Sequence, residues 1–264
     1  KHKQMEILDP VIIFGGSGQD GFYLSKILEK MKKKYIKFDG PSSNTNFLDI
    51  SNYEKVNNVI SNVKPRTIFN FAAISSLHHT NLQRNQKIIV EGTLNVLESV
   101  YQNRIRSKIF MASSGLIFKQ NGKPNKITDD FNLVNSYSLC RIEALLITRY
   151  YRSLGLNIYT GFLYNHESPK RPKDSLIMQI HKQIKESNKE TLNIKINNKY
   201  VVKEWTYAND IIVGIITFLN QNKIFEMNIG TGQGFSISYY IYLCAEILNF
   251  KNVNIIQSNF ENVS

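Results

Sequence analysis

VIIFGGSGQDG, residues Val11–Gly21, is the stretch that decides the fold. Four apolar residues, typical of a buried strand, lead straight into a turn with glycine at its first, fourth and seventh places. The first glycine permits a tight turn, the second lets backbone amides approach a pyrophosphate, and the third lets the following helix pack closely against the strand. An ordinary strand-to-helix turn is the alternative interpretation. The residues predicted to hold a dinucleotide are Gly15, Gly18, Gln19, Asp20 and Gly21.

Outward from this turn, short apolar runs alternate with longer stretches of helical period. Strands are expected at 11–14, 35–38, 67–71, 108–111, 157–160 and 225–228, and helices at about 20–33, 85–101 and 137–153. This alternation is typical of an α/β fold of the Rossmann type, in which helices flank a doubly wound parallel sheet.

After Asn165 the pattern changes to a polar stretch followed by a single amphipathic segment at about 174–187. We therefore expect a small substrate-binding lobe, whose completeness the sequence leaves open. The predicted dinucleotide-binding Rossmann domain contains residues 11–165 and about 200–232, and the predicted lobe contains about 166–199 and 233–264.

The composition argues against several classes of function. No apolar run approaches the roughly 20 residues that a membrane span requires. The net charge of +12 is scattered without the aromatic interleaving of a nucleic-acid surface, and it suits a small substrate that carries phosphates. Cys140 and Cys244 lack metal-ligand spacing, and the adjacent His78 and His79 lack a third ligand. We expect a cytoplasmic protein that binds no metal, membrane or nucleic acid.

The end of the second strand bears on the choice of cofactor. A carboxylate there, Asp39, can accept hydrogen bonds from an adenosine ribose and would repel a 2′-phosphate, which favours NAD over NADP. The neighbouring Ser42, Ser43 and Asn44 could serve such a phosphate, so NADP stays open. Asp49 is a candidate contact for the adenine edge, with a loop cap as the alternative.

With these residues in place, the sequence resembles the GDP-mannose 4,6-dehydratase branch of the extended short-chain dehydrogenase/reductase family. Further blocks agree in the expected order as far as about Ser236, and NHESP is the one most specific to the branch. The blocks are NFAA (Asn70–Ala73), EGTLNVLE (Glu91–Glu98), LYNHESPKR (Leu163–Arg171) and KEWTYAND (Lys203–Asp210).

The resemblance implies a tightly held nicotinamide that takes a hydride from C4 of a nucleotide sugar and returns a hydride later in the turnover. A GDP-sugar comes first among the substrates it implies, and the assembly it implies is a homodimer or a homotetramer. It places Leu163 and His166 near the nicotinamide. The further cofactor contacts are Asp49, Ile50, Ala72, Ala73, Ser113, Tyr137 and Arg141, and the substrate contacts are Ser75, Ser114, Asn165, Lys170, Arg171 and Lys203.

The catalytic pair departs from the family in one residue. Members use a tyrosine as base and a lysine four residues later on the same helix face, whereas this chain has Tyr137 and Arg141. Arg141 keeps the spacing and the positive charge, so Coulomb stabilisation of a tyrosinate is retained. A planar guanidinium, however, cannot occupy the position of an ammonium unchanged.

The acid of the dehydratases is also missing. In the family, a carboxylate two residues after a serine or threonine helps to expel the C6 hydroxyl, and here Leu116 stands at that spacing from Ser114. Ser114 can still bond the C4 hydroxyl. The chain also ends before the C-terminal segment with which relatives complete the substrate pocket. Three interpretations stay open: a dehydratase; a 4-epimerase, 4-dehydrogenase or 4-ketoreductase without dehydration; and an NAD-binding module whose catalysis is impaired.

Overall fold

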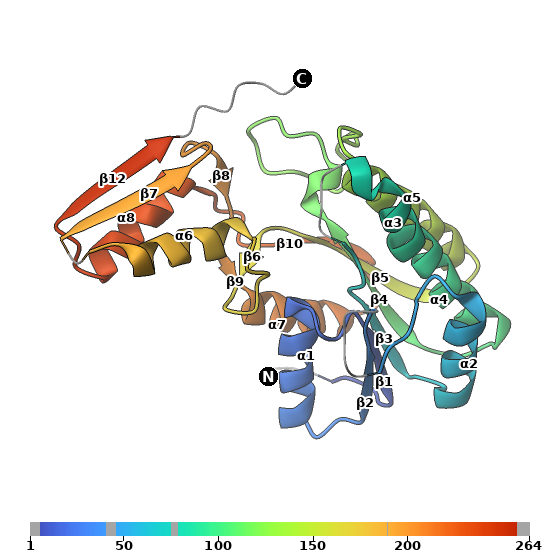
Figure 1. The fold of residues 1–264 in the computed structure, drawn as a ribbon. Helices are drawn as coiled ribbons and strands as arrows, with labels where there is room; N and C mark the ends of the chain where they lie inside the picture. Colours follow the sequence, from blue (N-terminus) through green and yellow to red (C-terminus); the bar gives the residue numbers. More distant parts are fainter. Residues whose placement is uncertain (1–5, 41–45, 75–78, 189, 258–264) are drawn as a thin grey trace. The chain divides into compact units, whose positions relative to one another are not determined.

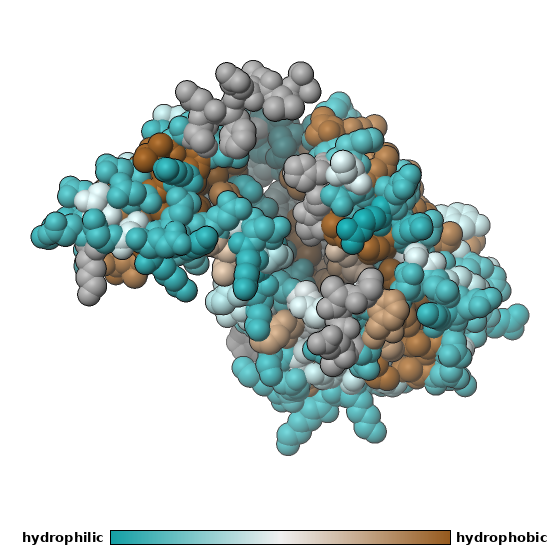
Figure 2. All heavy atoms as spheres, in the orientation of Figure 1, coloured by the Kyte–Doolittle hydropathy of each residue, from teal (hydrophilic) through white to brown (hydrophobic). Residues whose placement is uncertain are grey.

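The computed structural model describes residues 6–40, 46–74, 79–188 and 190–257, which form two compact units. The first unit contains the described residues up to Tyr164 together with Ala208–Ile229, and the second contains Asn165–Tyr207 and the described residues from Gly230 onward. On the face shown in Figure 2, hydrophilic side chains predominate and apolar ones lie between them. Among the helices described, none has both the length and the apolar character that a membrane crossing demands.

The first unit is built around a six-stranded parallel sheet with the strand order β10-β5-β4-β3-β1-β2 (Figure 1). The strands are β1 (Val11–Phe14), β2 (Tyr35–Phe38), β3 (Thr67–Asn70), β4 (Lys108–Ser114), β5 (Asn157–Leu163) and β10 (Glu226–Ile229). Strand β1 lies between β2 and β3, so the strand order reverses beside it. Doubly wound sheets bind ligands outside the carboxyl ends of the strands at such a point. The predicted α/β Rossmann fold is confirmed, and its predicted phosphate turn begins there.

Helices cover both faces of this sheet (Figure 1). On one face lie α1 (Gln19–Lys30) and α7 (Ala208–Leu219), and on the other lie α2 (Tyr53–Val63), α4 (Gly92–Gln102) and α5 (Ser136–Ser153). Because successive residues of a strand point to opposite faces, a strand covered on both sides is apolar throughout. All four residues of β1 are buried for this reason.

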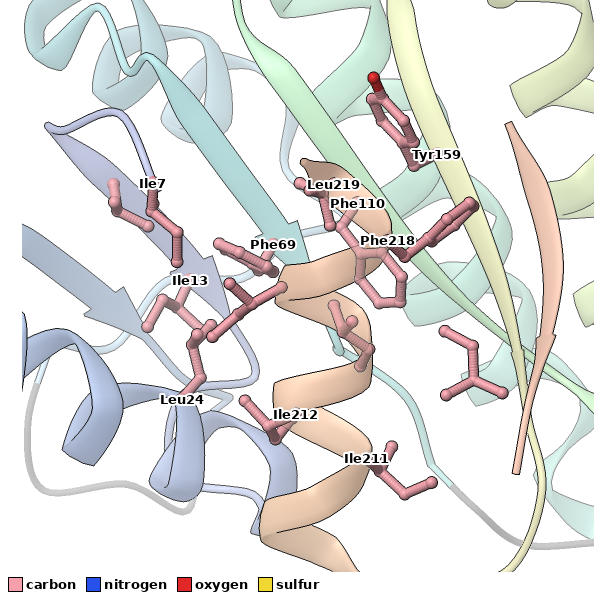
Figure 3. Close-up of a cluster of buried hydrophobic side chains, with 14 of the residues drawn as sticks. Ile7, Ile13, Leu24, Phe69, Phe110, Tyr159, Ile211, Ile212, Phe218 and Leu219 are labelled. Atoms are coloured by element: carbon pink, nitrogen blue, oxygen red, sulfur yellow. The ribbon is translucent and has the colours of Figure 1, made fainter. Parts of the chain in front are cut away.

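The core beneath α1 and α7 holds the start of α1 in place (Figure 3). Leu24 of α1 and Ile212 of α7 belong to one buried cluster with Ile13 and Phe69 of the sheet. Burial of such a side chain contributes about 1.5–3 kcal/mol to stability. The apolar face of α1 therefore fixes this helix, and with it the glycine turn, on the sheet.

The helix expected over 85–101 is divided. The chain passes through the short 3₁₀ segment η1 (His79–Asn81), the helical turn α3 (Leu82–Asn85) and the π-helical segment η2 (Gln86–Glu91) before α4 begins. Helix α2 was absent from the predicted elements. Its beginning is marked by Asn52, whose side chain accepts a hydrogen bond from the backbone N–H of Lys55.

A partly buried ion network joins α5 to β10. The carboxylate of Glu226 accepts hydrogen bonds from Nε and Nη2 of Arg149 at 2.9 and 2.7 Å, and from Nη1 of Arg152 at 2.7 Å. Burial acts to raise the pKa of Glu226, but the hydrogen bonds from Arg149 and Arg152 outweigh it and hold this pKa below its usual value. The network thus favours the ionised carboxylate in the folded protein.

Glu226→Gln is expected to lower the free energy of unfolding by about 3 kcal/mol near neutral pH, because two guanidinium groups lose their carboxylate. A carboxyl whose pKa is lower in the folded state stabilises the fold above its unfolded pKa, and this contribution is lost as the pH falls through the folded value. The difference from the parent chain should therefore shrink below about pH 4.5. Urea unfolding over a pH series measures it, with the exposed Glu54→Gln as control. A difference that persists unchanged in acid would contradict the prediction.

The second unit is assembled from short strand pairs and two helices, α6 (Leu176–Glu186) and α8 (Ile237–Ile247), within its described residues. Buried Leu192 and Ile194 alternate with exposed residues and pack in one cluster with Ile180 and Ile241 of the helices. The strand pairs are β6 (His166–Glu167) with β9 (Thr206–Tyr207), β7 (Thr191–Ile196) with β12 (Asn252–Gln257), and β8 (Val202–Lys203) with β11 (Phe235–Ser236).

The predicted boundaries between the units differ from the structure at three places. Asn165 and residues 200–207 and 230–232, which the sequence assigns to the Rossmann domain, belong to the second unit. Strand pairing is the reason, because β8 pairs with β11 and β9 pairs with β6. The chain returns to the first unit only where α7 begins, at Ala208.

Candidate cofactor and catalytic site

Three glycines of the turn stand where no side chain fits, and one of them, Gly16, would place a Cβ atom 2.4 Å from Cβ of Lys37. Gly15 has a φ of +80°, and a Cβ atom on it would lie 2.9 Å from the backbone nitrogen of Ala72. A Cβ atom on Gly21 would lie 2.5 Å from the carbonyl oxygen of Gly15. A Cβ on Gly18 would lie 3.3 Å from the same oxygen, so this position is less restricted. Gly15 and Gly21, the first and third glycines of the motif, therefore allow the tight turn and the close helix packing that the sequence predicts.

The amides of the first four residues of the turn, Gly15 to Gly18, are bonded within the protein. The N–H groups of Gly15 and Gly16 donate to the carbonyl of Phe38 at 2.9 and 3.2 Å, and that of Gly18 donates to the carbonyl of Gly15 at 3.3 Å. The N–H of Ser17 donates to a carboxylate oxygen of Asp39. These bonds tie the turn to the end of β2. What the turn presents to an anion is the positive end of α1, which has no side-chain cap.

Asp39 is buried with one carboxylate oxygen satisfied and the other unsatisfied. Its Oδ1 accepts the hydrogen bond from Ser17, while its Oδ2 has no partner among the described residues. Burying a carboxylate oxygen without a hydrogen-bond donor costs free energy. A hydrogen bond from a hydroxyl of a ligand would offset this cost. The predicted alternatives Ser42, Ser43 and Asn44 lie outside the described residues.

The loops after β2 and β3 place further predicted residues. Ala72, beside Ala73, donates its N–H to Oδ1 of the buried Asn70 at 3.1 Å, which fixes the backbone that Gly15 touches. Asp49 accepts at Oδ1 from the N–H and the hydroxyl of Ser51, at 3.0 and 2.7 Å, which holds its side chain in the loop. Ile50 is buried, and its carbonyl accepts from the side chain of Asn95. The predicted Ser75, like His78, lies outside the described residues.

Helix α5 brings the predicted catalytic pair together. Tyr137 and Arg141 are one turn apart and each is only 7 % exposed. Nε of Arg141 donates to the phenolic oxygen of Tyr137 at 3.1 Å, and its Nη1 donates to the carbonyl of Ala112 in β4 at 2.6 Å. The helix begins at this place because the side chain of Asn135 accepts from the N–H of Ser138 at 2.8 Å. The guanidinium is thus anchored to the sheet while it contacts the phenol.

The end of β4 carries the two predicted serines. Oγ of Ser113 is buried without a hydrogen-bond partner among the described residues. Oγ of Ser114 accepts from the N–H of Leu116 at 3.2 Å, which caps the short helix η3 (Gly115–Ile117) and leaves its own proton for donation. Leu116 is 42 % exposed and has no group that transfers a proton. Leu163, opposite Ser114 on β5, is buried.

Some polar residues near these strand ends were missed by the sequence analysis. Asn228 of β10 donates to the carbonyl of Asn125 at 2.7 Å, and its buried Oδ1 has no partner among the described residues. The hydroxyl of Tyr164 donates to the side chain of Asn125, and its ring lies so close to Gly115 that a Cβ there would be 2.6 Å from it. No sequence motif predicts these contacts, because Asn125 lies in an irregular loop.

The remaining predicted contacts, Asn165, His166, Lys170, Arg171 and Lys203, all belong to the second unit. Arg171 Nε lies 3.0 Å from Oε2 of Glu167, within ion-pair distance but without hydrogen-bond alignment. Burial raises the pKa of Glu167 against the opposing charge of Arg171, and burial lowers the pKa of Lys203 against that of Glu167. Lys170 is exposed. Among the described residues no three His, Cys, Asp or Glu side chains form a metal site.

Comparison with known proteins assigns the family. The family model described as GDP-mannose 4,6 dehydratase matches residues 12–259. The chain belongs to this family. It is therefore placed among enzymes that modify nucleotide sugars. GDP-mannose 4,6 dehydratase 2 of Arabidopsis thaliana is 24 % identical over 261 residues, which cover 87 % of this chain and 70 % of the relative. GDP-mannose 4,6-dehydratase of Vibrio cholerae is 23 % identical over 267 residues, which cover 90 % of this chain and 71 % of the relative.

Solved structures agree on the fold of this GDP-mannose 4,6-dehydratase family member. UDP-glucose 4-epimerase of Thermotoga maritima, solved with UDP-glucose, matches with a TM-score of 0.83 at 18 % identity and covers 96 % of this chain and 86 % of that one. UDP-glucose 4-epimerase of Thermus thermophilus, solved with NAD, matches with a TM-score of 0.76 at 17 % identity over 95 % and 88 % of the two chains.

Proposed function

We propose that this chain is an NAD-dependent enzyme of the GDP-mannose 4,6-dehydratase type, which acts at C4 of a GDP-sugar. The observation that carries the proposal is the buried contact between Arg141 and the phenolic oxygen of Tyr137, at the end of the sheet where the glycine turn lies. Families with this fold host many chemistries, so the function rests on these side chains rather than on the fold.

Features of the first unit fit a dinucleotide. The glycine turn brings the positive end of α1 to the carboxyl end of β1, where a diphosphate would be held. The unsatisfied Oδ2 of Asp39 offers an acceptor to a ribose hydroxyl, and the negative charge of this residue opposes a 2′-phosphate. The buried Oγ of Ser113 offers a further polar contact. When bound, the nicotinamide supplies a hydride acceptor.

Asp39→Asn is expected to weaken NAD binding by about tenfold, because a charge-assisted hydrogen bond to the ribose becomes a neutral one. NADP binding should weaken less or improve, since the carboxylate no longer repels the 2′-phosphate. Calorimetric titration with both dinucleotides gives the ratio of affinities. Asp130→Asn, at an exposed carboxylate, is the matched control and should change neither affinity. Equal losses for NAD and NADP would argue against a ribose contact.

The catalytic steps assigned to this chain are the positioning of a hydroxyl and the transfer of its proton. Tyr137 takes the proton of the C4 hydroxyl at its phenolic oxygen, and the guanidinium of Arg141 stabilises the negative charge that this atom carries as the base. The hydroxyl proton of Ser114 is directed at the C4 oxygen, while its Oγ keeps the bond from Leu116 N–H. Together these groups support hydride transfer at C4.

Elimination of the C6 hydroxyl requires a general acid in addition to these groups, and Leu116 cannot donate a proton. This residue favours a second candidate function, namely a 4-epimerase, 4-dehydrogenase or 4-ketoreductase that needs the hydride transfer without dehydration. A catalytically impaired NAD-binding module is the outcome if Arg141 does not replace the family lysine.

A nucleotide sugar is supported as substrate by the charge of the second unit. Arg171 and Lys203 are partly buried beside a single carboxylate, Glu167, so positive charge is in excess. The buried hydroxyls of Ser175 and Thr206 have no partner among the described residues and could donate to phosphate oxygens. We assign this group to the diphosphate of the substrate, and the guanosine is inferred from the family.

A homodimer or homotetramer is supported by an exposed apolar stripe on the first unit. Leu146 and Tyr150 of α5 are 52 % and 59 % exposed, and Leu94 of α4 is 41 % exposed. Helices with such stripes pair with their counterparts to remove apolar area from water. Sedimentation of the purified chain distinguishes a monomer from these assemblies.

The function is tested by mixing the purified chain with NAD and GDP-mannose and following the sugar by mass spectrometry. Loss of water with a 4-keto product supports the dehydratase. Hydride transfer without loss of water supports the second candidate. Bound NAD with neither product supports the impaired module, and failure to bind NAD refutes the proposal as a whole.

A further inference from the structure

A hollow lies at the edge of the first unit opposite the glycine turn. It is made of two adjoining pockets with cavity volumes of about 570 and 630 Å³. Residues at the amino ends of β3, β4 and β5 line it, whereas the cofactor turn follows the carboxyl end of β1 and Ser114 lies at the carboxyl end of β4. Arg66, Arg104 and Arg106 line both pockets, and Lys64 joins them in the second.

These four cations have no counter-charge within the part of the chain that the structure describes. No residue lining either pocket is acidic, and among the described residues none of the four side chains forms an ion pair or a hydrogen bond. Three less exposed arginines behave differently, since Arg141 donates to a carbonyl, and Arg149 and Arg152 share a carboxylate. The four side chains are exposed, so water weakens their mutual repulsion to about 1 kcal/mol for a pair at about 4 Å, and they are free to bind an anion.

The ends of helices explain only part of this charge. Helices α2, α4 and α5 all end beside the hollow, and each contributes roughly half a negative charge, together about 1.5 against four cations. Backbone groups already cap these ends: Lys64 N–H donates to the carbonyl of Ile60, and Ile105 N–H donates to that of Val100. No guanidinium of the group is bonded to a helix carbonyl.

The first pocket is lined by apolar side chains as well as by the arginines. Its lining includes Tyr101 and Leu154, each 41 % exposed, and the partly buried Ile105. Arginine forks bind phosphate oxygens in pairs, and an aromatic ring offers a face on which a base can stack. We propose that this hollow binds a nucleoside polyphosphate, with the phosphates between Arg66, Arg104 and Arg106 and the base against Tyr101. None of the residues that line this site is a cofactor or substrate contact, so its occupant takes no part in the reaction at C4.

The experiment is a calorimetric titration of the full chain with ATP in the presence of saturating NAD, which keeps the dinucleotide site filled. The test variant is Arg104→Asn with Arg106→Gln. Asparagine is chosen because Arg104 has a φ of +52°, a conformation that asparagine tolerates. The control, Lys30→Gln with Lys223→Gln, removes two exposed positive charges elsewhere on the unit. Lys64→Asn with Arg66→Gln is the second test variant if the first fails to fold, with asparagine again at a residue whose φ is positive, +49°.

ATP is expected to bind the parent chain and the control alike, and to bind the test variant at least about tenfold more weakly. Inorganic tripolyphosphate should bind more weakly than ATP, since it lacks the base. The proposal is overturned if ATP does not bind, if the control loses as much affinity as the test variant, or if tripolyphosphate binds as tightly as ATP. It is also overturned if a single-stranded RNA binds in place of ATP and loses affinity in the test variant. If the chain fails to bind NAD, it can be titrated with ATP alone. Failure of the proposed function can therefore be told apart from failure of the ATP site.

Discussion

Tyr137→Phe is expected to lower the rate of hydride transfer at C4 of the nucleotide sugar by a factor of about 10²–10⁴, the usual contribution of a positioned acid or base. The change removes one oxygen atom from a residue that is 7 % exposed and leaves the aromatic packing of α5 in place. The affinity for NAD should stay within about threefold of the parent value, because binding relies on the glycine turn and Asp39 rather than on this hydroxyl. Single-turnover reduction of bound NAD, followed by absorbance, measures the rate.

Tyr150→Phe is the matched control for this variant. Tyr150 lies on the same helix, and its side chain is exposed, so loss of its hydroxyl should leave the rate unchanged. Comparable losses in both variants, or a Tyr137→Phe enzyme that retains the parent rate, would remove Tyr137 from the mechanism.

Arg141 can be tested on the same assay, and the structure gives a direction that the sequence alone could not. The guanidinium donates through Nε to Tyr137 and through Nη1 to the carbonyl of Ala112, two bonds made in a fixed fork. A lysine ammonium is a point donor on a flexible stem and does not reproduce this fork. Arg141→Lys is therefore expected to lower the rate by about tenfold. A rise in rate would instead indicate that the replacement of the family lysine by Arg141 has reduced the activity.

Patterns with a fixed period or spacing allowed most of the first unit to be predicted. The β1 run is apolar throughout because both faces of its sheet are covered, and the i, i+4 spacing of Tyr137 and Arg141 places both on one side of α5. Asp39 was identified from its place at the end of β2. Its unsatisfied Oδ2, which strengthens the ribose assignment, could be seen only in three dimensions.

What escaped prediction depends on partners distant in the sequence or on very short elements. Strands β8 and β9 have two residues each, too few for any periodic signal, so residues 200–207 were assigned to the wrong unit. The amides of the turn are bonded because β2 ends where Phe38 can accept from two of them, a contact that no motif encodes. Glu226 meets Arg149 and Arg152 across more than 70 residues of chain.

Gly21→Ala is expected to push the start of α1 away from the glycine turn. The added methyl group would lie 2.5 Å from both the carbonyl oxygen of Gly15 and the Cα atom of Gly16. Backbone atoms cannot rotate away as a side chain can, so the start of α1 must shift from the turn. We expect a loss of about 3 kcal/mol in the free energy of unfolding, the upper part of the range for overpacking.

NAD affinity should fall with it by at least about tenfold, because a displaced helix end no longer directs its positive pole at the diphosphate. Gly214→Ala is the control, since its new methyl group would meet Ile229 at an ordinary 3.6 Å inside α7, where alanine favours the helix. Urea unfolding and calorimetric titration with NAD measure the two effects. If Gly21→Ala is destabilised yet binds NAD as tightly as the control, the turn packs the fold without holding the dinucleotide. The assignment of Tyr137 and Arg141 to hydride transfer would then lose its cofactor.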